Sequence, residues 1–352
     1  MMSQQIIKCR NLTDDLRKAL QTIDYNRLFI LADENTNRLC MPLLAGLPEL
    51  NDAPLIIIKA GDINKNIETL SIVWKFLSDN GATRKSLLLN LGGGMLTDLG
   101  GFAAATFKRG IRFINIPTTL LAVVDAAVGG KTGINFNGLK NEIGTFSPAE
   151  IVLIESEFFK TLDKENFLSG YAEMIKHALL ESEKEWQKIM SFNVDDVDYG
   201  TLKDLMVTSV GIKEKIVEQD PTEKGIRKAL NLGHTIGHAF ESLSYEINCP
   251  VLHGYAIAWG LVCELYLSFK KTGFEQNKLT KTIRFIKENY GIFRFDCKQY
   301  DRLYELMQHD KKNESAEVNF TLLSDIGNIK INQTASKEEI FDALDFYHEY
   351  FG

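Results

Sequence analysis

Short apolar runs that alternate with helix-like segments constrain the fold of the first half of the chain most strongly. Five short, mostly apolar runs have the composition of strands that are buried on both faces, at residues 27–33, 55–59, 85–91, 112–117 and 151–155. Between two of these runs, residues 67–80 place apolar side chains at helical spacing. Alternation of this kind predicts an α/β fold with a parallel sheet covered by helices on both faces.

The periodicity changes from strand-like to helix-like at about residue 164. Helical apolar patterns cover residues 165–182, 201–218, 234–247, 255–271, 277–290 and 337–350. Residues 317–323 and 328–331 predict one small hairpin. Since 352 residues are long for one hydrophobic core, we expect two domains. These are an α/β domain at 1–164 and a mainly α-helical domain at 165–352, with a soft boundary.

The charge and cysteine content narrow the possible partners and compartments. A formal net charge of −7 and a pI near 5.5 argue against nucleic acid or an anionic membrane surface as the main partner. The most apolar segment, residues 255–263, is shorter than the roughly 18 residues of a membrane span. The five cysteines are scattered, without C-x-x-C spacing, which favours reduced thiols. We therefore expect a cytoplasmic protein.

A glycine-rich turn, Gly92-Gly93-Gly94, follows the strand predicted at 85–91 and opens a helix. Consecutive glycines let the backbone approach a pyrophosphate, and a helix N-terminus attracts an anion. Thr97 stands where a third glycine would complete the G-x-G-x-x-G motif. An ordinary tight turn between strand and helix is therefore the alternative interpretation.

A second glycine-rich stretch, residues 128–133, resembles a P-loop but lacks one required residue. A Walker A motif needs a glycine at the position that Asp125 occupies. What is left is a glycine-rich loop that carries Lys131 and is followed by Lys140 and Asn141. Such groups suit a phosphate or carboxylate on a small substrate. The alternative is a solvent-exposed basic loop.

Three of the six histidines, His234, His238 and His253, lie within twenty positions. On a helix, His234 and His238 are four residues apart and project from one face, so both could bind one metal ion. The alternative is a pair that caps or lines a helix. Gly233 and Gly237 are poor helix formers, and their presence beside the histidines indicates a close approach to another group.

Glu173 lies one helical turn from both Lys176 and His177 on a predicted helix. In this arrangement Glu173 could bind a metal ion and Lys176 could handle a proton. The alternative is an ordinary ion pair on a helix surface.

Glu223, Arg227 and Asn231 recur at four-residue spacing and lead into the histidines. On a helix these polar side chains would form one line directed at the histidine cluster. Such a line is difficult to explain as solvated surface.

Together these motifs resemble the 3-dehydroquinate synthases. The resemblance runs in order from Asp33 to Lys312. It is carried by Gly92-Gly-Gly94 with Asp98, Arg109-Gly-Ile, Pro117-Thr-Thr-Leu-Leu-Ala122, Val124-Asp125, Val128-Gly-Gly-Lys-Thr-Gly-Ile-Asn135, Lys140-Asn141, Ala172-Glu173 with Lys176, Leu230-Asn-Leu-Gly-His-Thr-Ile-Gly-His-Ala239, His253-Gly and Asp310-Lys-Lys312. The resemblance implies an N-terminal Rossmann-like domain that binds NAD, a helical C-terminal domain, an active site in the cleft between them and a homodimer.

The resemblance also implies a role for each matching residue. The implied ligands of Zn²⁺, or of Co²⁺, are Glu173, His234 and His253. The implied NAD-binding residues are Asp33, Asp62, Lys65, Gly92, Gly93, Gly94, Met95, Asp98, Thr118, Thr119, Lys140, Phe158, Phe159, Lys160 and Thr161. The implied substrate-binding residues are Asp125, Lys131, Asn141, Lys213, Arg227, Asn231 and Lys312, together with Arg109 of the partner subunit. Glu223, His238 and Lys176 are the implied catalytic residues.

The implied reaction converts 3-deoxy-D-arabino-heptulosonate 7-phosphate, a phosphorylated keto-sugar acid, into 3-dehydroquinate and phosphate. It proceeds by transient NAD oxidation, phosphate elimination, reduction, ring opening and aldol closure, and it belongs to the shikimate pathway of aromatic amino acid biosynthesis. The chain departs from the family pattern at Asp62, Ala126, Ala127 and Ser169. Rival interpretations are another sugar phosphate cyclase, a metal-dependent polyol dehydrogenase and a catalytically silent metabolite-binding protein.

Overall fold

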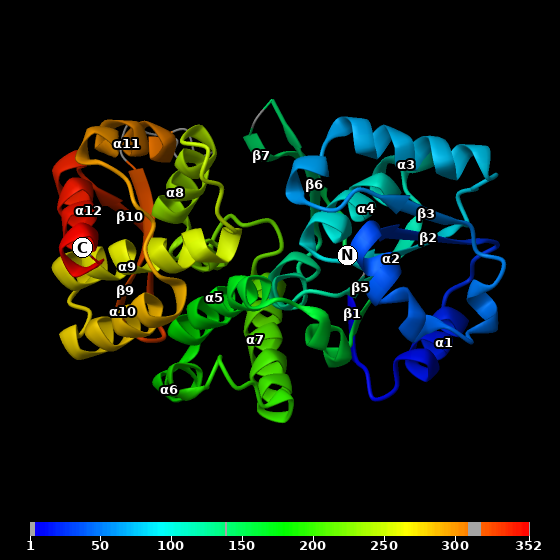
Figure 1. The fold of residues 1–352 in the computed structure, drawn as a ribbon, viewed down its shortest axis with the longest axis horizontal. Helices are drawn as coiled ribbons and strands as arrows, with labels where there is room; N and C mark the ends of the chain where they lie inside the picture. Colours follow the sequence, from blue (N-terminus) through cyan, green and yellow to red (C-terminus); the bar gives the residue numbers. More distant parts are fainter. Residues whose placement is uncertain (1–3, 138, 309–317, 352) are drawn as a thin grey trace. The chain divides into compact units, whose positions relative to one another are not determined.

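The computed structural model describes residues 4–137, 139–308 and 318–351 (Figure 1). The chain divides into two compact units, Met1–Asp163 and Lys164–Gly352. The first unit is built on a parallel sheet, and the second is mainly helical.

The first unit alternates strands with helices along the chain. Its strands are β1 (Gln5–Lys8), β2 (Leu28–Asp33), β3 (Leu55–Ile58), β4 (Leu87–Gly92), β5 (Arg112–Pro117), β6 (Lys131–Phe136), β7 (Leu139–Phe146) and β8 (Ile151–Ile154). Its α-helices are α1 (Leu12–Thr22), α2 (Glu34–Leu39), α3 (Ile67–Asp79) and α4 (Gly94–Thr106). Short 3₁₀ segments are η1 (Met41–Leu44), η2 (Pro48–Leu50), η3 (Asp62–Asn64), η4 (Phe107–Arg109) and η6 (Ser156–Thr161), and η5 (Ala122–Ala126) is a π-helical turn.

Six strands of the described residues form one parallel sheet in the order β1-β8-β5-β4-β2-β3. From β2 the chain moves outward to β3, and it then returns across β2 to β4. The strand order therefore reverses between β2 and β4. In open parallel sheets, ligands bind in the crevice at the carboxyl ends of strands where the order reverses. Asp33 ends β2 and Gly92 ends β4, so both residues lie at this crevice.

Burial explains why the central strands form where they do. Every residue of β2 and of β4 is buried. Leu87, Leu89 and Leu91 of β4 pack in one apolar cluster with Leu16 and Leu20 of α1. Alternate residues of β4 face one side of the sheet, so the other side needs its own helical cover. Continuous apolar runs in the sequence therefore identify this sheet correctly.

The five strands predicted from the sequence are confirmed as β2, β3, β4, β5 and β8, and the predicted helix at 67–80 is confirmed as α3. Strand β1 was not predicted. It has only four residues, two of them exposed, and it pairs with β8 at the edge of the sheet. A short edge strand of this kind leaves no continuous apolar run in the sequence.

The prediction of a glycine-rich loop at 128–133 is wrong from Lys131 onward. Strands β6 and β7 form an antiparallel hairpin, in which Gly133 lies opposite Gly144. A Cβ atom on Gly133 would lie 2.6 Å from the carbonyl oxygen of Ile143. These glycines therefore allow two strands to approach closely. Because glycine is also typical of loops, the sequence did not predict the hairpin.

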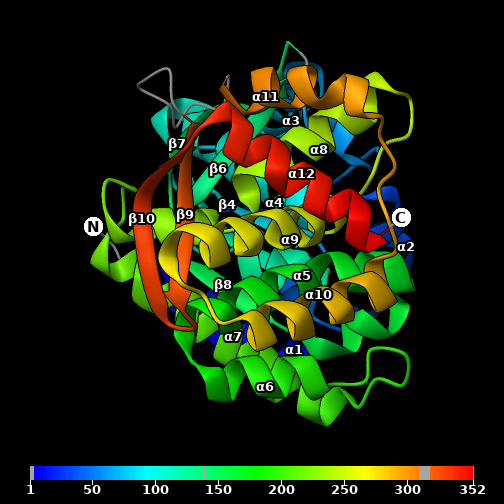
Figure 2. The same cartoon turned by 90° about the vertical axis from the view of Figure 1, so that its left-hand side faces the viewer.

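The second unit contains helices α5 (Lys164–Glu181), α6 (Glu183–Ser191), α7 (Tyr199–Gln219), α8 (His234–Glu246), α9 (His253–Thr272), α10 (Gln276–Tyr290), α11 (Tyr300–Gln308) and α12 (Lys337–Phe351). It also contains the 3₁₀ segments η7 (Ile226–Asn231) and η8 (Cys297–Gln299), and a hairpin of β9 (Val318–Asp325) and β10 (Asn328–Ala335). Figure 2 shows α9 between α10 and α12. No helix in the described ranges is long and apolar enough to cross a membrane.

Six helices predicted for this unit are confirmed as α5, α7, α8, α9, α10 and α12, and the predicted hairpin is confirmed as β9 and β10. Helices α6 and α11 were not predicted. The helical line expected through Glu223, Arg227 and Asn231 is wrong. Helix α7 ends at Gln219, Glu223 has a left-handed backbone with φ of 61°, and η7 follows. Pro221 explains the break, because the residue before a proline disfavours helical geometry.

The packing of α4 on the sheet generates a stability prediction. Gly100 of α4 lies against Asn90 of β4, and a Cβ atom there would be 2.2 Å from Asn90 Oδ1. Asn90 is buried and donates a hydrogen bond to Asn115 (2.9 Å). Gly100→Ala should therefore lower the free energy of unfolding by about 1–3 kcal/mol through overpacking, measured by urea denaturation.

The matched control is the same substitution at Gly211 of α7, where a Cβ atom would meet no heavy atom within 4 Å. Gly211→Ala should raise the free energy of unfolding by about 0.5–1 kcal/mol, because alanine favours the helix. Equal effects of the two substitutions would contradict the packing described for Gly100.

Candidate functional site

Helix α9 makes backbone contact with two other elements of the second unit. A Cβ atom on Gly254, the second residue of α9, would lie 1.9 Å from the carbonyl oxygen of Ser169 in α5. A Cβ atom on Gly260 would lie 2.1 Å from the carbonyl oxygen of Gly233, the residue before α8. Only glycine allows such approaches. The start of α8 and the middle of α5 therefore lie directly against α9.

A side chain from α5 caps the start of α9. The Gly254 N–H donates to Ser169 Oγ (3.1 Å). First-turn N–H groups of a helix have no partner within the helix, and a hydroxyl acceptor there stabilises the helix end. The serine that departs from the family pattern thus provides a polar contact at the helix that begins with His253.

Glu173, on α5, lies between two histidines that begin helices. Its side chain is fully buried. Glu173 Oε1 lies 3.5 Å from His234 Nε2 and 3.5 Å from His253 Nε2. With metal–ligand bonds of about 2.0–2.2 Å, the ligand atoms of a tetrahedral zinc site are roughly 3.4 Å apart. Each of the two histidine nitrogens therefore lies at the distance from Glu173 Oε1 that is expected between two ligands of one metal ion.

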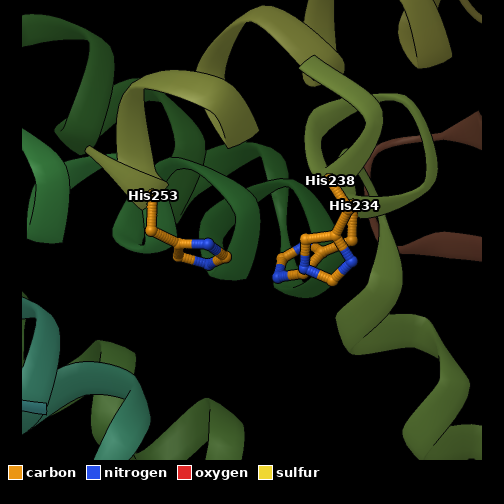
Figure 3. A group of neighbouring side chains, drawn as sticks. All are labelled: His234, His238 and His253. Atoms are coloured by element: carbon orange, nitrogen blue, oxygen red, sulfur yellow. The ribbon is translucent and has the colours of Figure 1, made fainter. Parts of the chain in front are cut away.

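His238 lies in the same cluster (Figure 3). Nitrogen atoms of His234, His238 and His253 all lie within 4.8 Å of one another, and the three ring centroids are 5.2–5.7 Å apart. Figure 3 shows His253 facing His234 and His238 from a different helix. The histidines face one another, so they do more than cap a helix. The geometry accommodates either the pair at four-residue spacing or the set with Glu173.

Hydrogen-bond partners orient two of the imidazole rings. His253 Nδ1 lies 3.3 Å from Glu241 Oε2, and His234 Nδ1 lies 3.1 Å from the carbonyl oxygen of Leu232. A partner at Nδ1 fixes the ring so that Nε2 faces the site. Glu241 was not among the residues predicted from the sequence. Its signal was its position three residues after His238, on the same helix face.

Charge around His253 changes its proton affinity. Burial alone lowers the pKa of this imidazole, but the carboxylates of Glu241 and Glu173 outweigh burial and raise the pKa to about 9. In the metal-free chain the ring is therefore protonated at neutral pH.

Glu173 also contacts Lys176, through Oε2 and Nζ. The side chains are 0% and 1% exposed, so the alternative of a surface ion pair is wrong. The neighbouring His177 is buried as well, with Nδ1 2.8 Å from Ser209 Oγ. Lys213 on α7 is also buried. Burial of a lysine ammonium costs free energy unless the ammonium is paired with an acidic side chain or a ligand.

Asn231 and Glu223 meet although no continuous helix joins them, since Asn231 Nδ2 donates to Glu223 Oε1 (2.8 Å). Arg227 is buried, and its Nη1 donates to the carbonyl oxygen of Pro221 (2.7 Å). Asn231 and Glu223 are therefore brought together by the turn between α7 and η7, and not by a continuous helix. Lys312 lies outside the described residues.

In the first unit, the glycine-rich turn between β4 and α4 lies at the crevice. The Thr118 N–H, after β5, donates to the carbonyl oxygen of Gly92 (3.0 Å). A Cβ atom on Gly93 would lie 3.0 Å from Thr119 Cγ2. Gly94 begins α4, so the N–H groups of its first turn point into this region. Such a turn suits a pyrophosphate on structural grounds.

Five predicted residues form three polar contacts among residues 62–65, α4 and the β6–β7 hairpin. Lys65 Nζ donates to Asp98 Oδ2 (2.9 Å) and to Asn141 Oδ1. Lys140 Nζ lies 3.3 Å from Asp62 Oδ2. Burial raises the pKa of Asp98, against the opposing effect of the Lys65 ammonium. Asp62, one of the departures from the family pattern, therefore forms an ion pair with Lys140 of the hairpin.

The other predicted residues of the first unit have varied surroundings. Asp33 caps α2 by accepting hydrogen bonds from the backbone of Asn35 and Thr36 (both 2.9 Å). Phe158 and Phe159 are buried in η6. The remaining positions are Met95 in α4, Arg109 in η4, Asp125 in η5, Lys131 at the start of β6, and Lys160 and Thr161 in η6.

Comparison with known proteins identifies the family. Residues 55–169 match the family described as 3-dehydroquinate synthase N-terminal, and residues 170–313 match the family described as 3-dehydroquinate synthase C-terminal. The chain is 56% identical over 352 residues to a 3-dehydroquinate synthase of Parabacteroides distasonis, which covers 100% of both sequences. The chain belongs to the 3-dehydroquinate synthase family. It is an enzyme of this family, as the resemblance implied.

Solved structures show the same fold at lower identity. A 2-epi-5-epi-valiolone synthase from Streptomyces hygroscopicus, with NAD⁺ and Zn²⁺ bound, has a TM-score of 0.88 at 24% identity and covers 99% of this chain and 98% of its own. A 2-deoxy-scyllo-inosose synthase complexed with carbaglucose-6-phosphate, NAD⁺ and Co²⁺ has a TM-score of 0.84 at 20% identity, over 96% of this chain and 95% of its own. The predicted α/β and helical dehydroquinate synthase-like fold is confirmed.

The raised pKa of His253 generates a prediction for this member of the 3-dehydroquinate synthase family. A metal ion must displace the proton from the imidazole, so metal affinity should rise with pH up to about pH 9, roughly tenfold per pH unit while one proton is displaced. Competition for Zn²⁺ with a chromophoric chelator across this range measures the effect.

Glu241→Gln is the control, because it removes a charge that raises the pKa of His253. The rise in metal affinity should then level off at a lower pH. An affinity that does not change with pH in the unsubstituted chain would contradict the prediction.

Proposed function

We propose that the chain converts 3-deoxy-D-arabino-heptulosonate 7-phosphate into 3-dehydroquinate and phosphate, with NAD as a catalytic cofactor and Zn²⁺ or Co²⁺ as the metal. Family membership over the whole chain supports the reaction. The observation that carries the metal assignment is the position of Glu173 Oε1, 3.5 Å from Nε2 of both His234 and His253. The high identity to a 3-dehydroquinate synthase favours this activity over a cyclitol-forming cyclase or a polyol dehydrogenase.

The proposed metal ligands are Glu173, His234 and His253. One carboxylate and two imidazoles are a common ligand set for catalytic zinc, and they leave a coordination position for substrate. A metal ion held by these residues would supply a Lewis acid able to acidify a substrate hydroxyl. Within this arrangement Glu241 and the carbonyl oxygen of Leu232 hold the two imidazoles by Nδ1. His238 then contacts the substrate instead of the metal.

The first unit is proposed to bind NAD. The turn at Gly92–Gly94 offers backbone donors to a pyrophosphate, and Asp33, at the end of β2, lies at the same crevice. The other proposed NAD-binding residues are Asp62, Lys65, Met95, Asp98, Thr118, Thr119, Lys140 and the segment 158–161. NAD bound there would supply reversible hydride transfer, so the proposed reaction would have no net redox change.

The second unit is proposed to bind the carboxylate of the substrate. Arg227 presents a planar guanidinium that can donate two parallel hydrogen bonds to a carboxylate. Its contact with the carbonyl oxygen of Pro221 limits its rotation. Lys213 and Asn231 complete this set. The phosphate is assigned to Lys131, Asn141 and Lys312, with Asp125 as a further substrate ligand and Arg109 of the partner subunit as another cation.

Glu223, His238 and Lys176 are proposed to transfer protons. Glu223 accepts a hydrogen bond from Asn231, which holds its carboxylate in one orientation. Lys176 is held against Glu173 in a buried environment. A positioned acid or base of this kind typically contributes 10²–10⁴-fold to a rate.

The domain roles, the homodimer and the cytoplasmic location stay predictions. We assign NAD binding to residues 1–164 and metal and substrate binding to residues 165–352, a division drawn close to the two compact units. The homodimer rests on the family resemblance, and the location rests on the composition of the chain.

The decisive experiment supplies the heptulosonate phosphate with NAD⁺ and Zn²⁺. Phosphate release and NADH absorbance are then followed in the same sample. The proposal predicts continuous phosphate release with no net accumulation of NADH. Absence of phosphate release, or NADH formed in proportion to product, would refute it.

Substitution of single histidines tests the ligand assignment. His253→Ala should lose bound metal, because it removes one of three ligands. His238→Ala should retain metal and lose rate by roughly 10²–10⁴-fold, as expected for a proton-transfer group. Metal content by atomic absorption and steady-state kinetics distinguish the two. Loss of metal in His238→Ala, with retention in His253→Ala, would reverse the assignment.

A further inference from the structure

Glu264 is a buried acidic residue that the proposed reaction does not use. It lies on α9 and is 0% exposed. Glu264 Oε2 accepts a hydrogen bond from the Gly233 N–H (2.6 Å), and Oε1 accepts one from the Ile236 N–H (3.0 Å). A buried carboxylate is costly without such partners. Both donors belong to another part of the chain, so the two bonds join distant segments.

The two donors belong to the start of α8. Gly233 immediately precedes His234, and Ile236 lies in the first turn of the helix. N–H groups at this position have no partner within the helix, and the helix N-terminus favours a negative charge. Gly233 has no side chain with which to cap the helix. The carboxylate of Glu264 therefore serves as the cap of α8, although it belongs to α9.

A second contact fixes the same crossing. Gly260 lies one turn before Glu264 on α9. A Cβ atom on Gly260 would be 2.1 Å from the Gly233 carbonyl oxygen and 2.6 Å from the Gly237 backbone nitrogen. The start of α8 thus rests on α9 at two points, a backbone contact at Gly260 and a hydrogen-bonded cap at Glu264. The crossing can neither slide nor open without loss of one of them.

The two helices that cross here begin with the two proposed histidine ligands, since α8 begins at His234 and α9 begins at His253. We propose that Glu264 is a positioning residue that fixes the start of α8 on α9. It thereby sets the separation at which Nε2 of His234 and Nε2 of His253 bind one metal ion together with Glu173. This inference rests on the metal site of the proposed function.

A glutamine cannot replace this carboxylate fully. The carboxylate offers an acceptor oxygen to each of the two N–H donors. A glutamine amide has one oxygen, and its NH₂ group would face the second N–H. Glu264→Gln therefore conserves volume and disturbs the cap. Glu264→Asp keeps both oxygens but withdraws them by one methylene.

The experiment uses the full chain, with metal removed by a chelator and Co²⁺ then titrated. Glu264→Gln should weaken Co²⁺ binding by roughly 10–100-fold, as loss of groups that orient metal ligands does. It should also shift the visible absorption bands of bound Co²⁺, which report ligand geometry. Glu264→Asp should change both quantities in the same direction and by less.

The matched control is Ser182→Ala. Ser182 Oγ caps α6 by accepting a hydrogen bond from the Glu185 N–H (3.3 Å), and α6 carries no residue of the proposed site. This substitution should lower the thermal midpoint of unfolding without changing Co²⁺ affinity or absorption. It separates loss of a helix cap in general from loss of this one.

Unchanged Co²⁺ affinity and absorption in Glu264→Gln would overturn the inference and leave the proposed metal site intact. If Glu264→Gln does not fold, Glu264→Asp decides by the same two measurements. Failure of the unsubstituted chain to bind Co²⁺ would refute the metal assignment itself, and with it the role of Glu264.

Discussion

The cluster of Glu173, His234 and His253 depends on backbone contact between α9 and its neighbours. Gly254 and Gly260 bring α9 against α5 and against the start of α8, at distances that no side chain tolerates. Each contact is accompanied by a polar bond, from Ser169 Oγ at the first turn of α9 and from Glu264 at the first turn of α8. The three proposed ligand atoms, from three helices, converge because these crossings fix where the helices begin and meet.

The first unit applies the same physical principle to a sheet. Gly93 allows the turn after β4 to meet Thr119 after β5, and parallel pairing brings both strand ends to one edge. The polar contact of Lys65 with Asp98 and Asn141 then joins this edge to the β6–β7 hairpin. Glycine sets the approach, and the polar contacts of the buried Lys65 fix the position. The close approach and the polar contacts depend on each other, because a buried polar group that lost its partners would be costly.

Periodic features could be predicted from the sequence, and contacts between distant segments could not. Apolar runs identified β2 and β4 because these strands are buried on both faces, whereas the short edge strand β1 gave no such signal. The spacing of the histidines located the cluster. Spacing alone could not show that His253 faces His234 and His238, because a contact between two helices leaves no periodic pattern in the sequence. Glu264 was overlooked for the same reason, since it contacts residues 28 and 31 positions away.

The central claim is that Glu173, His234 and His253 bind one metal ion, while His238 does not. Anomalous X-ray scattering at the zinc absorption edge, from a crystal of the zinc-loaded enzyme, tests this claim most directly. One anomalous peak is expected, about 2.0–2.2 Å from Glu173 Oε1, His234 Nε2 and His253 Nε2. A peak bonded to both His234 and His238, with Glu173 outside bonding distance, would contradict it.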